Sequence, residues 1–97
     1  MTPFPSYLRL GGHTIKVMRV PGLIKDQDAF GTWNDEDLTI CIDAGLKSSL
    51  AWETLLHEIL ESCNDSAELG LPHNTIQALG LLLHQALQPL IEGGIGA

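Results

Sequence analysis

The stretch of sequence that decides the fold is Leu38-Thr39-Ile40-Cys41-Ile42-Asp43. Its aliphatic side chains alternate with threonine, cysteine and aspartate, which gives a period of two. Because successive side chains of a β-strand point to opposite faces, this alternation predicts a strand with one apolar face. An acidic turn over residues 34–37 precedes it. We therefore expect the strand to pair with residues 29–33 across that turn, as a β-hairpin.

A second hairpin is predicted at the start of the chain. Residues 7–10 and 13–20 alternate polar and apolar side chains around Gly11-Gly12, and a glycine pair supplies the positive φ angles of a tight turn. The first half of the chain therefore predicts a small antiparallel sheet made of two hairpins.

Two helices should follow the sheet. Ser48 or Ser49 can cap the first, which runs to about residue 68 and stops at Gly70. The second begins near Asn74, where Asn74 and Gln77 have the spacing of a capping box. Its predicted core stripe consists of Ile76, Leu79, Leu83, Ala86 and Leu90. Pro89 should kink or fray its end.

These elements predict an α+β fold with the architecture of a small antiparallel sheet followed by two helices. A chain of 97 residues with 44% apolar residues has room and core material for one domain. We expect a single domain over residues 1–97, with residues 1–6 and 93–97 flexible.

The charge is strongly acidic and unevenly distributed. Five lysines and arginines stand against twelve aspartates and glutamates, a net charge of -7, and no lysine or arginine follows Lys47. This distribution argues against direct nucleic-acid binding and favours a basic protein partner, a metal ion or a cationic substrate. The alternative is that the negative charge only keeps the domain soluble.

No signal peptide or membrane-spanning run is recognisable. Cys41 and Cys63 lack metal-type spacing, so a reduced pair in a cytoplasmic protein is expected.

The first predicted helix contains one constellation of chemical interest, His57-Glu58-Ile59-Leu60-Glu61. Residues i and i+4 share a helix face, so His57 and Glu61 could reach one metal ion. Glu58 would flank that ion and could act as a general base on a bound water. The alternative is that the glutamates form a solvated face and no metal is bound.

The order of these segments resembles the small phage-encoded zincin-like metallopeptidase family, over most of the chain. The resemblance is carried by Gly31-Thr32-Trp33, the strand 38–43, and Glu53-Thr54-Leu55-Leu56-His57-Glu58-Ile59-Leu60. It implies a zincin-like minimal domain in which the helix carries His-Glu-x-x-His and an acid early in the next helix is the third zinc ligand. His57 and Glu58 match this pattern.

Two positions depart from the family's pattern. Glu61 replaces the second histidine, and Gln77, a poor ligand, stands about where the acid is expected. His73 could be the third ligand, or only a loop residue. The candidate zinc ligands are therefore His57, Glu61 and His73, with Glu58 as the catalytic base.

The second helix predicts an interface. Leu81 would lie beside the polar, uncharged side chains of Gln77, His84 and Gln88, and a chain this short offers little to cover it. We therefore expect a protein partner or self-association through Leu81 and His84, with His84 at the surface.

The leading functional interpretation is a phage-type accessory protein on a degenerate zincin-like scaffold, which acts in the host cytoplasm by binding, and thereby could inhibit, a protein partner. The alternative is a zinc-dependent metallopeptidase that uses the His57-Glu58-x-x-Glu61 helix. A structural or assembly role is the third.

Overall fold

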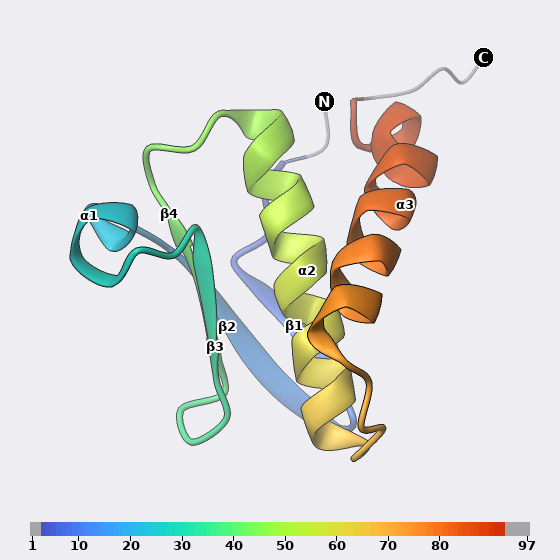
Figure 1. The fold of residues 1–97 in the computed structure, drawn as a ribbon. Helices are drawn as coiled ribbons and strands as arrows, with labels where there is room; N and C mark the ends of the chain where they lie inside the picture. The colour runs from blue at the N-terminus through green and yellow to red at the C-terminus, as the bar shows by residue number, and fades with distance from the viewer. Residues whose placement is uncertain (1–2, 93–97) are drawn as a thin grey trace.

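The structure, a computed structural model, describes residues 3–92. Its elements in chain order are β1 (Tyr7–Leu10), β2 (His13–Val20), α1 (Leu23–Gln27), β3 (Gly31–Asn34), β4 (Thr39–Asp43), α2 (Ser48–Ser66) and α3 (His73–Ile91). The fold is α+β, as predicted, with a four-stranded sheet followed by two long helices (Figure 1). The expected flexible end at residues 93–97 lies outside the described residues.

Both predicted hairpins form, but the sheet that they build is mixed rather than antiparallel. β1 pairs with β2 and β3 pairs with β4 in antiparallel fashion. The strand order is β1-β2-β4-β3, so β4 lies beside β2 and runs parallel to it, with Val17 opposite Ile40. The prediction treated each hairpin as local and did not specify which strand joins the two. Because β4 takes the inner place, β3 is left at the edge of the sheet.

The short helix α1 was not predicted and occupies the connection between the hairpins. It follows Gly22, which has a φ of 80°, and ends at Asp28, which has a φ of 53°. A helix of five residues is too short to leave a periodic signal in the sequence. Because α1 extends to Gln27 and Asp28 is its C-cap, β3 begins at Gly31 and not at residue 29 as expected.

The core lies between the sheet and α2. Ile40 and Ile42 of the predicted strand are fully buried, and they pack with Ile15, Val17, Ala51 and Leu55. Burial of such aliphatic side chains contributes about 1.5–3 kcal/mol each. Phe4 packs edge-on against Trp52, with ring centroids 5.1 Å apart, which anchors the N-terminal arm at this residue.

α3 forms a third layer, because it packs on α2 and not on the sheet (Figure 1). Its buried residues are Ile76, Gly80 and His84, so the predicted core stripe is confirmed at Ile76 and wrong at the other positions: Leu79, Leu83, Ala86 and Leu90 are exposed. The reason is the small residue at position 80, where even a Cβ would lie in contact with the Cα of His57, at 3.6 Å. A small side chain, glycine or alanine, and not the most apolar stripe, sets the face on which the helices meet.

The helix ends also differ in detail from the prediction. α2 begins at Ser48, with Lys47 at the N-cap, and ends at Ser66. α3 begins at His73 behind Pro72, no side chain caps it, and it continues past Pro89. The predicted capping box of Asn74 and Gln77 therefore does not form. None of the helices within residues 3–92 has both the length and the apolar composition needed to cross a bilayer.

The close approach of β3 to α2 can be tested with a pair of glycine substitutions. A Cβ on Gly31 would lie 2.7 Å from Cγ2 of Thr54 and 3.2 Å from the carbonyl oxygen of Cys41. We expect Gly31→Ala to lower the free energy of unfolding by about 1–3 kcal/mol. Gly80→Ala meets only ordinary contacts and gains helix propensity, so it should be neutral or stabilising. Chemical denaturation measures both, and equal effects would contradict this packing.

Candidate metal centre

Three side chains converge where the start of α3 meets the middle of α2. Nε2 of His57 lies 3.4 Å from Oε2 of Glu61, one turn further along α2. Nδ1 of His73, the first residue of α3, lies 3.5 Å from the same oxygen. One ligand atom from each of the three residues lies within 4.8 Å of the other two. The three predicted ligands are therefore together, although His73 belongs to a different helix.

The loop between the helices holds His73 in this place. The side chain of Asn64 accepts a hydrogen bond from the backbone N–H of Leu71 at 2.8 Å and donates one to the carbonyl oxygen of Leu71 at 3.3 Å. The backbone N–H of Leu69 also donates to the carbonyl of Asn64, at 3.0 Å. These bonds tie the loop to the last turns of α2, so α3 begins beside Glu61.

The spacing suits a tetrahedral metal ion. Ligand atoms about 2.1 Å from a tetrahedral zinc lie about 3.4 Å from one another. The two distances to Glu61 agree with this value, and the ligand atoms of His57 and His73 lie within 4.8 Å of each other. Their rings are 5.3 Å apart at an angle of 66°, so they are not stacked and their nitrogens can face one ion.

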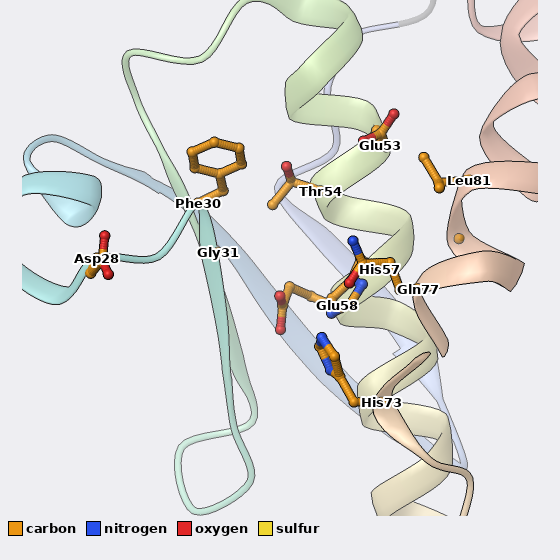
Figure 2. Close-up of a pocket in the computed structure, with 11 residues that line it drawn as sticks. Asp28, Phe30, Gly31, Glu53, Thr54, His57, Glu58, His73, Gln77 and Leu81 are labelled. Carbon is orange, nitrogen blue, oxygen red and sulfur yellow. The ribbon is translucent and has the colours of Figure 1, made fainter. Parts of the chain in front are cut away.

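Glu58 lies beside this cluster and points toward β3 (Figure 2). Only 7% of it is exposed, and its carboxylate accepts no hydrogen bond from residues 3–92. Burial, followed by repulsion from Glu61, raises the pKa of the Glu58 carboxyl to about 7. A carboxyl with this pKa can both accept and release a proton near neutral pH, which is the property of a general base. The sequence alone allows Glu58 a place on a solvated face, and its burial excludes that alternative.

Two hollows flank Glu58. The first, the His73 cavity, has a volume of about 410 Å³ and is lined by Phe30, Gly31, His57, His73, Gln77 and Leu81, among others (Figure 2). The second, the Trp33 cavity, has a volume of about 560 Å³ and is lined by Thr32, Trp33, Asp35, Glu61, Asn64 and Asp65. Glu58 lines both. Gly31, Thr32 and Trp33 of β3 belong to the segments that carry the resemblance, but their place beside α2 follows only from the strand order.

His84 does not belong to the exposed surface, which corrects the prediction. It is only 6% exposed, and its Nδ1 lies 3.8 Å from Oε1 of Glu53. The burial follows from its place one turn after Gly80, on the face of α3 that contacts α2. Leu81 is 46% exposed and lies at the rim of the His73 cavity. Cys41 and Cys63 carry free thiols, as expected.

Comparison of the chain with protein-family models, with curated proteins and with solved structures finds no match in any of the three. The chemistry open to the site therefore follows from its own geometry.

The buried carboxyl of Glu58 predicts a pH dependence of stability in protein freed of metal by a chelator. Its folded pKa, about 7, lies above the ordinary value of 4.5, so the folded state holds a proton that the unfolded state releases. The free energy of unfolding should therefore fall as pH rises from about 4.5 to about 7, by up to roughly 3 kcal/mol. Glu58→Gln should remove most of this fall. The exposed control Glu68→Gln should keep the fall. If Glu58→Gln also kept the pH profile of the wild type, the fall in stability would not come from the ionisation of Glu58.

Proposed function

We propose that this protein is a zinc-dependent hydrolase of the peptidase type, with His57, Glu61 and His73 as metal ligands and Glu58 as general base. The observation that carries the proposal is the convergence of the three ligand atoms, within 4.8 Å of one another, beside a buried carboxyl. Chance pairs of histidine and glutamate on one helix are common, but a third ligand supplied from another helix is not required by packing.

The identity of the donors supports zinc. Catalytic zinc sites use three protein ligands, and two imidazoles with one carboxylate is one of the sets that recur. The resemblance implies the same set, with a histidine at the position of Glu61 and an acid from the second helix. Here the carboxylate stands on α2 and the imidazole on α3, so the two ligand types are exchanged and the set is preserved. On this interpretation the motif is altered but complete, which favours the zinc-dependent metallopeptidase, the second of the three functions considered from the sequence.

The chemistry follows from the positions of the side chains. Zinc, when bound, supplies an activated water and polarises a carbonyl oxygen. Glu58 takes the proton from the attacking water and delivers it to the leaving amine, since it follows the ligand His57 directly on α2 and lines the same cavity. Within residues 3–92, β3 pairs with β4 alone, so its other edge can hydrogen-bond an extended peptide.

A specific observation also supports protein binding, the function that the sequence favoured. Leu82 is 61% exposed and Leu90 is 67% exposed, and Leu79 and Leu83 lie beside them on the outer side of α3. The spacing of Leu79, Leu83, Ala86 and Leu90 is four, three and four residues, which is typical of helices that pair. We call these four residues the leucine stripe. Leu79 and Leu83, in the middle of α3, are 40% and 39% exposed.

We propose a second copy of this chain as the occupant of the leucine stripe. No aspartate, glutamate, lysine or arginine occurs in His73–Ile91, although the chain has a net charge of -7. Two α3 helices can therefore meet without like-charge repulsion. A twofold interface also requires a surface that is complementary to itself, and an uncharged leucine stripe meets this requirement. A basic partner would find no carboxylate on α3 to pair with.

The zinc site is tested by metal titration of protein purified without an affinity tag. We expect one zinc per chain, and His73→Ala should weaken its binding on the order of 100-fold, because a three-ligand site loses a ligand. Gln77→Ala is the matched control, since Gln77 lines the same cavity and is not a ligand. Glu58→Gln should also keep the metal. Competition with a chromogenic chelator measures the affinities. Wild-type protein without stoichiometric zinc, or His73→Ala with wild-type affinity, would contradict the proposal.

Self-association through α3 is tested by light scattering. The double substitution Leu79→Lys and Leu83→Lys should convert a dimer to a monomer, because it places positive charges opposite each other across the interface. Ala78→Lys with Gln85→Lys adds the same charge at exposed positions of α3 outside the leucine stripe. This matched control should leave the dimer intact, and zinc content should not change in either variant. A wild-type protein that stays monomeric at about 100 μM would contradict the proposal.

A further inference from the structure

The Trp33 cavity has an acidic lining, and Glu61 is the only one of its lining residues that is a candidate metal ligand. Asp35, Glu58, Glu61 and Asp65 all face it, and none of its lining residues is a lysine or arginine. The proposed hydrolase uses Glu61 as a zinc ligand and Glu58 as the general base, and it gives no role to the other two acidic residues of the cavity, Asp35 and Asp65. Neither takes part in any ion pair formed within residues 3–92.

We propose that the Trp33 cavity is the subsite that receives an arginine or lysine side chain of a peptide substrate. This inference rests on the proposed hydrolase function and names the class of substrate: peptides with a basic residue close to the scissile bond.

The position of Glu58 places the cavity within reach of that bond. Glu58 is more than nine-tenths buried, its carboxylate accepts no hydrogen bond in the described part of the chain, and it lines both cavities. A scissile bond at Glu58 therefore lies between them. The chain around β3 passes both cavities, with Phe30 and Gly31 beside the first and Thr32 and Trp33 beside the second. A peptide extended along β3 advances about 3.3 Å per residue and its successive side chains point to opposite faces, so residues two positions apart in one peptide would enter the two cavities.

The chemistry of the cavity selects a cationic side chain. The indole Nε1 of Trp33 donates a hydrogen bond to Oδ2 of Asp65 at 3.3 Å, which holds the ring and the carboxylate together. A guanidinium or ammonium group is attracted by an aromatic ring and by carboxylates, and guanidinium can pair with a carboxylate through two hydrogen bonds. The ring also offers apolar surface to the methylene stem of the side chain, which a bare metal ion would not use.

The test uses zinc-loaded Glu58→Gln protein, which should bind peptides without cleaving them. The probes are fluorescein-labelled hexapeptides that differ only in one residue, which is Arg, Lys, Gln or Glu. Fluorescence anisotropy should show the Arg and Lys peptides binding roughly 10-fold more tightly than the Gln peptide, or better. Asp35→Asn with Asp65→Asn, introduced in the same background, should abolish this preference and leave the affinity for the Gln peptide unchanged.

A matched control separates the subsite from the overall charge of the protein. Asp26→Asn with Glu68→Gln removes the same two charges away from the cavity and should keep the preference for Arg and Lys. Three results would overturn the inference. The charge control could lose the preference for Arg and Lys, the variant without Asp35 and Asp65 could keep it, or all four peptides could bind equally well to the parent protein. Zinc content, measured on the same samples, reports separately on the hydrolase: a protein that holds zinc but shows no preference retains the proposed function and lacks the subsite.

Discussion

The contact between Gly80 and the backbone of His57 is the constraint on which the rest of the structure depends. A residue no larger than alanine at this position lets α3 lie close against the middle of α2, which is the element that α3 packs on. With the contact fixed there, the first residue of α3 comes to lie beside Glu61, and the ligand set is completed. The same contact turns the leucines of α3 outward. One small residue thus accounts for both the candidate metal centre and the exposed leucine stripe.

The second feature that organises the site is the acidity of the groove between α2 and β3. Burial disfavours the ionised form of a carboxyl, and perturbed carboxyls cluster at functional sites. Only 7% of Glu58 is exposed, and repulsion from its neighbour Glu61 adds to the effect of burial on its pKa. A divalent cation on Glu61 would reverse this repulsion and favour the ionised form of Glu58. In the proposed function the acidic groove is a site for cations, with the metal at its centre and a basic side chain beside it.

The sequence predicted the elements better than their arrangement. The period of two in residues 38–43 and the helical spacing after Ser48 identified one strand and one helix, because both patterns are local. The parallel pairing of β2 with β4 joins the two hairpins, and no local pattern in the sequence of either hairpin predicts it. The face of α3 was predicted wrongly because apolar periodicity favoured Leu79 and Leu83, whereas helix approach at Gly80 decided it. His84 was misplaced for the same reason. At the site, His57, Glu58 and Glu61 could be found from their spacing, and His73 was only one of several candidates until the loop geometry was known.

The central claim is that His57, Glu61 and His73 bind one zinc ion together. X-ray absorption spectroscopy of the zinc-loaded protein tests it most directly, because it reports the ligands of the metal and needs no substrate. We predict a four-coordinate zinc with only nitrogen and oxygen neighbours at about 2.0–2.2 Å and the outer-shell scattering of two imidazoles. In His73→Ala that scattering should fall to one imidazole. A spectrum with sulfur neighbours, with six oxygen ligands, or with no imidazole contribution would contradict the claim.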